Sequence, residues 1–284
     1  MTYEVVLSTT LPSPGMTASN NSMTVNDTGT VGGGWLTQPP GYPKIEIGYN
    51  WLPGAGFTFP SHPGWTINDA EVTPNNNGFS YGNAVGNNGL GKPTTPMFGF
   101  IDNNGTFIAL PSGQDGSELN GMNDFGLAVG DNFDAQGNNH PFIYNVATDT
   151  ESPLVFQGVT DPSVNDINDS GQMVGCGIVP GTGITEGLYL NGQGGVQFLA
   201  PPGAQCTQAN SLNNTGQIVG DYTDPAGRTH GFLFDIATQA YTTLDFPNAT
   251  NTCVSGINDH GVVVGTYTDA QNVTHGMELV VAHT

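Results

Sequence analysis

The sequence predicts an all-β fold, a single six-bladed β-propeller of four-stranded antiparallel blades. The first observation is a turn motif, an apolar residue followed by Asn, Asp or Asn, any residue and Gly. Its first Asn stands at positions 123, 168, 213 and 258 and therefore recurs every 45 residues. The second observation is that each repeat holds four short strand-like segments separated by turns, as a propeller blade does. The third is that no segment has a helical periodicity long enough to compete.

Two further copies of the motif precede these four. One is Val25-Asn26-Asp27-Thr28-Gly29. We expect the other at Ile67-Asn68-Asp69, resuming at Gly82 after an insertion over residues 70–81 in a hairpin that is tight elsewhere. Six copies predict six blades within one domain over residues 1–284, with motifs starting near residues 25, 67, 122, 167, 212 and 257.

The strands are expected in sequence order within each blade. All connections in the clearest repeat are of hairpin length, which predicts an antiparallel meander. Its strands are expected at residues 207–213, 217–223, 230–235 and 240–246. In the first unit we expect the third and fourth strands at residues 44–50 and 56–60, and in the second unit near 97–102 and 106–110.

The N-terminal segment is expected to close the ring. Residues 3–9 resemble residues 241–247, the last strand of a later repeat, whereas the final repeat lacks that strand. If the N-terminal strand supplies what the last blade omits, no blade is left with a free edge. The ring is then closed by the N-terminal strand.

Composition limits the classes of partner. The chain has three basic and 24 acidic residues, a net charge of −21. Nucleic-acid phosphates and anionic membrane surfaces need Lys and Arg, so both are excluded as partners. The charge is compatible with cations, with neutral ligands such as sugars, or with solubility alone. No apolar run is long enough to span a membrane, and we expect a monomer.

The three cysteines, Cys176, Cys206 and Cys253, lack the spacing of a metal site. A disulfide between Cys206 and Cys253 and free buried thiols are both open.

A second motif gives the chain a family resemblance. Thr229-His230-Gly231-Phe232-Leu233-Phe234, together with His140-Pro141-Phe142 and His275-Gly276-Met277, follows the Asn-Asp-x-Gly turns. The combination resembles the bacterial extracellular HAF-repeat proteins, well over residues 118–282 and weakly over 17–117. The resemblance implies a repeated β-fold and export, hence an extracellular or periplasmic location, and no agreed activity. The His position departs from the pattern in three units, which hold Lys44, Met97 and Glu186.

Three sets of residues are weighed as cation or acid–base sites. The turn residues could form a cation-binding ring, although Asn-Asp-x-Gly is also a self-closing turn. The three histidines could be metal or acid–base groups, or hydrogen-bonded structural residues. Oxygen-rich loops suit Ca²⁺, with Asp131, Asp134, Asp221 and Asp224 as candidates. The ring positions are expected at Asp27, Asp69, Asp124, Asp169, Asn214 and Asp259.

Residues that break the repeat are the most informative about ligand binding, because the fold asks the same of every blade. Three residues before the repeated Asn, on the presumed innermost strand, stand Trp65, Asn120, Asn165, Asn210 and Ser255. Five residues before it stand Glu118 and Gln208, with His62 and Asp161 nearby in the sequence pattern.

These residues support three hypotheses. The first is a binding module for a small neutral or cationic ligand or a glycan at the axial mouth, with hydrogen bonds from the polar side chains and stacking on Trp65. The second is a hydrolase or lyase that cleaves a glycan or small ester, with Glu118 as general acid or base assisted by His62 or Asp161. The third is a scaffold without pocket chemistry. Ca²⁺ is the one cofactor that the composition suggests.

Overall fold

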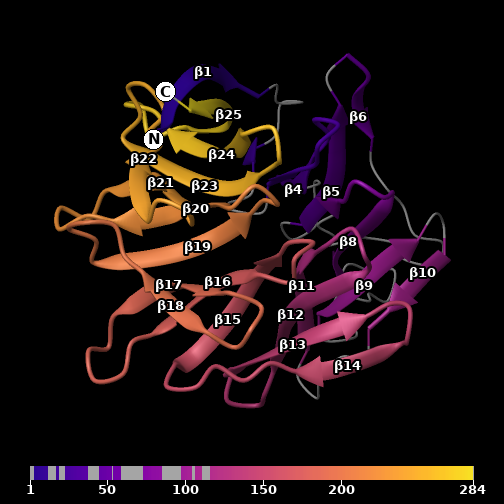
Figure 1. Ribbon diagram of the computed structural model, residues 1–284. Coiled ribbons are helices and arrows are strands. Elements are labelled where there is room, and N and C mark those ends of the chain that lie inside the picture. The colour runs from indigo at the N-terminus through magenta and orange to yellow at the C-terminus, as the bar shows by residue number, and fades with distance from the viewer. Residues whose placement is uncertain are drawn as a thin grey trace.

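The protein is a six-bladed β-propeller, as the sequence predicts (Figure 1). The computed structural model describes residues 3–11, 17–18, 23–37, 45–52, 54–58, 73–84, 97–103, 106–110 and 116–283. These residues contain strands and turns and no helix. They form six antiparallel sheets arranged around a common axis.

The third to sixth blades follow the predicted meander. In each, the strands pair in chain order, and the first strand lies nearest the axis. The third blade contains β11 (Ser117–Met122), β12 (Leu127–Phe133), β13 (Asn139–Asn145) and β14 (Thr150–Pro153). The fourth contains β15 (Thr160–Ile167), β16 (Met173–Ile178), β17 (Thr185–Leu190) and β18 (Val196–Leu199). The fifth contains β19 (Cys206–Leu212), β20 (Gln217–Thr223), β21 (Thr229–Asp235) and β22 (Ala240–Thr243), and the sixth β23 (Asn251–Ile257), β24 (Val262–Thr268) and β25 (Thr274–His283).

The first two blades have shorter inner strands. In the first blade, two short strands both pair with β4. The first blade contains β2 (Thr17–Ala18), β3 (Thr24–Val25), β4 (Val31–Thr37), β5 (Ile45–Leu52) and β6 (Gly56–Thr58). The second contains β7 (Thr73–Pro74), β8 (Phe79–Ala84), β9 (Phe98–Asn103) and β10 (Thr106–Ala109).

The turn of the second blade lies at Asn75, and its prediction at Asn68-Asp69 is wrong. Asn75 N–H donates to Phe79 O at 2.9 Å, and Asn75 Oδ1 accepts the Asn77 and Phe79 amides at 2.9 and 3.0 Å. Gly78 has a φ of +83°, a conformation that glycine adopts without steric cost. The hairpin is therefore as tight as the others, and the predicted insertion over residues 70–81 does not interrupt it.

The N-terminal strand closes the ring, which confirms the prediction. β1 (Tyr3–Thr10) pairs antiparallel with β25, from Tyr3 opposite His283 to Thr10 opposite Met277. The sixth sheet therefore runs β1-β25-β24-β23, with the start of the chain outermost (Figure 1). Pairing removes the exposed edge that β25 would otherwise present.

A bulge in the inner strand explains a further glycine of the repeat, which stands seven residues after the repeated Asn. In the third to sixth blades the register between the first two strands shifts at one residue, for example between Leu119 and Gly121. The bulge brings the carbonyl of Gln208 so close to Gly220 that a Cβ atom there would overlap it. The same holds for Gly130, Gly175 and Gly265 in their blades. Only glycine fits under the bulge.

Candidate ligand channel along the propeller axis

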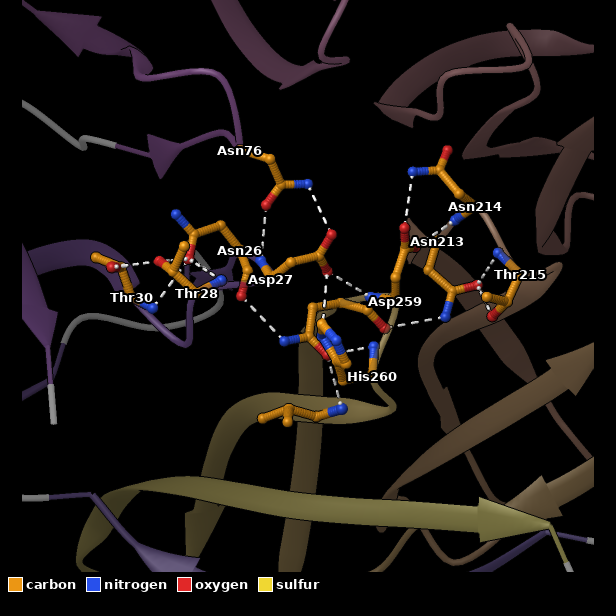
Figure 2. Close-up of polar contacts among 12 residues, drawn as sticks. Asn26, Asp27, Thr28, Thr30, Asn76, Asn213, Asn214, Thr215, Asp259 and His260 are labelled. Carbon is orange, nitrogen blue, oxygen red and sulfur yellow. Dashed lines mark hydrogen bonds and ion pairs between the residues drawn. The ribbon is translucent and has the colours of Figure 1, made fainter.

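The repeated Asn closes its own turn and then binds the next blade. In the fifth blade, Asn213 Oδ1 accepts the amide of Thr215 at 3.1 Å (Figure 2). It also accepts the amide of Gln217 at 2.9 Å, and Asn213 Nδ2 donates to Asn258 O at 3.0 Å. The same donor bond joins every neighbouring pair of blades. It runs from Asn26 to Asn75 (3.4 Å), Asn75 to Asn123 (3.2 Å), Asn123 to Asn168 (3.2 Å), Asn168 to Asn213 (3.2 Å) and Asn258 to Asn26 (2.9 Å).

The residue after this Asn forms a second closed belt. Its backbone N–H donates to the side-chain Oδ1 of the same position in the next blade, so that the belt returns from Asp259 to Asp27 at 2.8 Å (Figure 2). Asn76 and Asn214 are the two amides of the belt, and each donates from Nδ2 to the carboxylates on both sides. The belt consists of Asp27, Asn76, Asp124, Asp169, Asn214 and Asp259.

The belt is part of the fold and also a ring of charge. Every carboxylate oxygen of Asp27, Asp124, Asp169 and Asp259 accepts a hydrogen bond within the belt. Asp69, which the sequence placed in this ring, is replaced by Asn76. The geometry therefore matches the turn interpretation of the motif and leaves four negative charges at one mouth of the axis.

The predicted ligand-binding asparagines are the bulge residues of the inner strands. Their Nδ2 groups donate across to the next blade: Asn120 to Val164 O (2.8 Å), Asn165 to Ala209 O (2.9 Å) and Asn210 to Val254 O (2.7 Å). Their donors are thus used by the fold. In the described part of the chain, the Oδ1 atoms of Asn120 and Asn210 accept no hydrogen bond, so they remain free as acceptors.

A cavity of about 320 Å³ follows the axis behind the belt. It is lined by Asn120, Asn165, Asn210, Gln208 and Ser255, the described residues that the sequence proposed for ligand binding, and by the belt itself. The Ser255 side chain is buried and its hydroxyl has no hydrogen-bond partner. Gln208 is exposed to the cavity. The described residues that line the cavity include no Lys, Arg or His, so the lining is anionic and rich in acceptors.

Asp166 lines the cavity and was missed in the sequence. It is partly buried, and its oxygens accept bonds from Ser211 Oγ (2.7 Å), Leu212 N–H (3.2 Å) and Ile167 N–H (2.8 Å). Burial raises the pKa of Asp166 to about 6, against the opposing effect of these donors. Asp166 has Gly121 and Gly256 as its counterparts in other blades, so the search for residues that break the repeat would have found it at this position.

Glu118 lies beside Asp131 rather than beside the predicted partners. Glu118 and Asp131 are directly opposite on β11 and β12. Burial raises the pKa of Glu118, and burial followed by the charge of Glu118 raises the pKa of Asp131 to about 7. Neither residue lines the cavity. Asp161 accepts a hydrogen bond from the Asn139 amide at 3.2 Å, and no described contact joins it to Glu118.

His62 and Trp65 lie outside the described residues. Trp65 was selected by counting back from Asn68. With the turn at Asn75, the third preceding position is Val72 instead. The stacking face predicted for a sugar therefore has no support from the register of the second blade.

The repeated histidines clamp hairpins. In three blades an Asp accepts two amides of the turn between the second and third strands, and the histidine six residues later contacts its Oδ2. The Nε2–Oδ2 distances are 3.1 Å for His140 and Asp134, 3.3 Å for His230 and Asp224, and 2.8 Å for His275 and Asp269. Across the residues that the structure describes, no three His, Cys, Asp or Glu side chains are grouped to hold a metal. The predicted Ca²⁺ loops at Asp134 and Asp224 thus remain a prediction.

The three cysteines are free thiols. Burial, followed by nearby carboxylates, raises the pKa of Cys176 to about 12 and that of Cys253 to about 11. A thiol with a raised pKa is a poor nucleophile and a poor metal ligand at neutral pH. The described residues contain no helix that is long and apolar enough to span a membrane.

Comparisons with known proteins show the fold alone. No protein-family model and no curated protein matches the chain, so the HAF-repeat resemblance is not confirmed. A protein of unknown function from Dyadobacter fermentans superposes with a TM-score of 0.56 at 11% identity, over 99% of both chains. A putative TolB from Agrobacterium tumefaciens gives 0.57 at 11% identity, over 92% of this chain and 90% of the other. The propeller domain of the Trilobed protease from Pyrococcus furiosus gives 0.52 at 10% identity, over 92% and 94%.

Proposed function

We propose that this protein binds small organic cations in its axial channel. The observation that carries the proposal is the cavity of about 320 Å³, whose lining combines carboxylates with amide and hydroxyl oxygens and includes no described basic residue. A ligand that offers N–H donors and positive charge is complementary to such a lining, whereas an anion is repelled. The size suits a molecule of several heavy atoms rather than a polymer.

The hydrogen-bond inventory favours an ammonium over a sugar. Asn120, Asn165 and Asn210 each donate one amide hydrogen to a carbonyl of the neighbouring blade, and Asn120 and Asn210 donate the second to Asp131 and Asp221. What remains toward the cavity is mainly acceptors, and an ammonium group has donors only. A sugar would need both donors and acceptors and usually an aromatic face. The exposed Phe125, which follows Asp124 in its turn, adds an aromatic ring at the acidic mouth, where organic cations gain cation–π attraction.

Gln208 provides the test because it is exposed and makes no described side-chain contact. We expect isothermal titration calorimetry with 1,4-diaminobutane to show saturable binding at low ionic strength, and glucose to show none. Gln208→Lys places a positive charge in the channel and should weaken diamine binding by more than tenfold. Gln136→Lys makes the same charge change at an exposed loop and should leave it unchanged. Equal losses in both variants, or no binding to the wild type, would refute the proposal.

A glycan- or ester-cleaving hydrolase or lyase is the second candidate. Glu118 supports it, because a carboxyl group with a raised pKa is suited to general acid catalysis. In this version the neighbouring carboxyl is Asp131 in place of His62 or Asp161. The measurement is turnover of nitrophenyl glycosides and esters between pH 5 and 7, which Glu118→Gln should abolish.

We infer an extracellular or periplasmic location for the protein. The HAF-repeat resemblance and the structural likeness to a putative TolB support it. Fractionation of the native organism, with the chain found in the culture medium or periplasm, is the expected result. Recovery of the chain in the cytoplasm would contradict it.

A further inference from the structure

Glu118 and Asp131 are neighbouring carboxyl groups, Asp131 buried and Glu118 partly buried, with no described basic residue beside them. The two residues are cross-strand neighbours, and Asp131 is 0% exposed. Side chains directly opposite on antiparallel strands project to the same face of the sheet, with their Cβ atoms about 5 Å apart. Two carboxylates so placed destabilise each other unless a cation or a proton is held between them.

The two carboxylate oxygens of Asp131 differ in their hydrogen bonds. Its Oδ2 accepts Asn120 Nδ2 at 3.0 Å and Ser163 Oγ at 2.7 Å. Its Oδ1 is buried and has no hydrogen-bond partner. A buried carboxylate oxygen without a donor is rare and costs stability. The unpartnered oxygen belongs to the carboxyl group that feels the charge of Glu118, so it marks the place where a positive charge is missing.

No basic residue in the described part of the chain neutralises the pair. The chain contains three basic residues, of which Lys44 and Lys92 lie outside the described residues. Arg228 is engaged between the fifth and sixth blades, where it donates to Thr250 O and Ala249 O at 2.7 Å. Among the described residues, none supplies the pair with a positive charge, which would then come from solution.

The equivalent position in the fifth blade shows what is special about this pair. Asp221 occupies the place of Asp131, and it also accepts its own bulge asparagine, Asn210, at 2.8 Å. Its cross-strand neighbour is Gln208, so this cross-strand pair contains one carboxylate rather than two. Neither carboxylate oxygen of Asp221 is a buried atom without a hydrogen-bond partner. The paired charge and the unpartnered oxygen occur together at Glu118 and Asp131.

We propose that Glu118 and Asp131 bind a calcium ion at the junction of the third and fourth blades. The available ligands are oxygens: the two carboxylates, the Ser163 hydroxyl beside Asp131, and water for the remaining positions. Hard oxygen ligands with flexible geometry suit Ca²⁺, whereas Mg²⁺ demands a stricter octahedron. The nearby Cys176 thiol stays protonated and excludes a soft-metal site. The ion would enter from the side of Glu118, which is less buried than Asp131.

The test is calorimetric titration of the EDTA-treated, desalted protein with CaCl2, alongside thermal unfolding with and without the ion. We expect one saturable site with a Kd on the order of 0.1–1 mM, as for weakly charged extracellular sites, and a higher unfolding temperature in Ca²⁺. Asp131→Asn and Glu118→Gln should each weaken binding at least tenfold. Both remove like-charge repulsion, so without Ca²⁺ they should unfold no earlier than the wild type, which shows that they fold.

Asp221→Asn is the matched control and should bind Ca²⁺ as the wild type does. The proposal is overturned if the wild type gives no Ca²⁺ heat, or if the two pair variants bind as tightly as the wild type. No Ca²⁺ binding, combined with a wild-type stability that changes near pH 7 and is insensitive to pH there in Asp131→Asn, would assign a shared proton to the pair instead. The diamine test on Gln208 is separate, so either proposal can fail alone.

Discussion

Removing the charge of a buried aspartate should stabilise this protein at neutral pH. Asp221 is 9% exposed, and burial raises its pKa from 3.8 to about 6 despite the hydrogen bond from Asn210. A pKa that is higher in the folded state means that the proton is held more tightly there. The stability that Asp221 contributes is therefore complete below about pH 4 and is lost as the pH rises through about 6.

The expected stabilisation follows from the size of the pKa shift of Asp221. About two pKa units correspond to about 3 kcal/mol at 1.36 kcal/mol per unit. Asp221→Asn abolishes this penalty and keeps an oxygen to accept the Asn210 bond, but its new amide needs a partner. We therefore expect the variant to be about 2 kcal/mol more stable than the wild type at pH 8, or about 4–8 °C in unfolding temperature. At pH 4 the two should be equal within about 0.5 kcal/mol.

The assay is urea unfolding at pH 4, 6, 7 and 8, followed by Trp fluorescence. Glu151→Gln makes the same charge change on the exposed strand β14 and should keep the wild-type dependence on pH. The reasoning is refuted if Asp221→Asn is less stable than the wild type at pH 8, or if its stability falls with pH as steeply. Asp166, whose pKa is also raised to about 6, will leave a residual pH dependence of the same sign in the variant.

Three further predictions concern the turns, the bulges and the thiols. Asn213→Ala removes one inter-blade bond and four bonds within its buried turn, so urea unfolding should show a loss of about 2–4 kcal/mol. The exposed Asn138→Ala should lose less than about 1 kcal/mol, and similar losses in the two variants would contradict a structural role for the repeated Asn. Gly220→Ala would drive a Cβ into the Gln208 carbonyl and should give no soluble folded protein. Gly227→Ala, at a φ of +81° in open space, should lower the free energy of unfolding by only about 1–2 kcal/mol. A well-folded Gly220→Ala would show that the bulge can relax. Burial raises the pKa of Cys176 and Cys253. Iodoacetamide at pH 8 should therefore label these thiols more than tenfold more slowly in the native state than in urea. Equal labelling rates would show that the thiols are accessible and ionised in the native state.

The sequence predicted the architecture because the architecture is periodic. A 45-residue step of Asn-Asp-x-Gly turns, with hairpin-length connections, determines the number of strands per blade and the number of blades. The closing strand was also visible, since the first strand resembles one that the last repeat lacks. The one misplaced element was the second turn. Ile67-Asn68-Asp69 keeps the apolar residue and the Asn-Asp pair of the motif, whereas Asn75-Asn76-Asn77-Gly78 keeps the Gly that the copy at Asn68 lacks. The hydrogen bonds that close the turn at Asn75 show that this second copy forms the hairpin.

The candidate site was less accessible to sequence reasoning because its residues are related across blades. The strand pattern placed Asn120, Asn165, Asn210 and Ser255 on the axis, and they do line the cavity. It could not show that the amide donors are used to join blades, since those bonds run to carbonyls about one repeat away, such as Val164 O. It also paired Glu118 with Asp161, although the neighbour is Asp131.

What the sequence determined by itself is the repeating unit, because turns, strands and glycine positions depend on local sterics and short-range hydrogen bonds. What only the tertiary structure decided is which oxygens remain unpaired. Groups from other strands or blades decide that Asp131 Oδ1 lacks a hydrogen bond and that the channel keeps free acceptors. They also join Asp27 and its counterparts into a closed belt. The charge and hydrogen-bonding state of a side chain is set by every group that surrounds it in space, and those groups are brought together only when the ring of blades has closed.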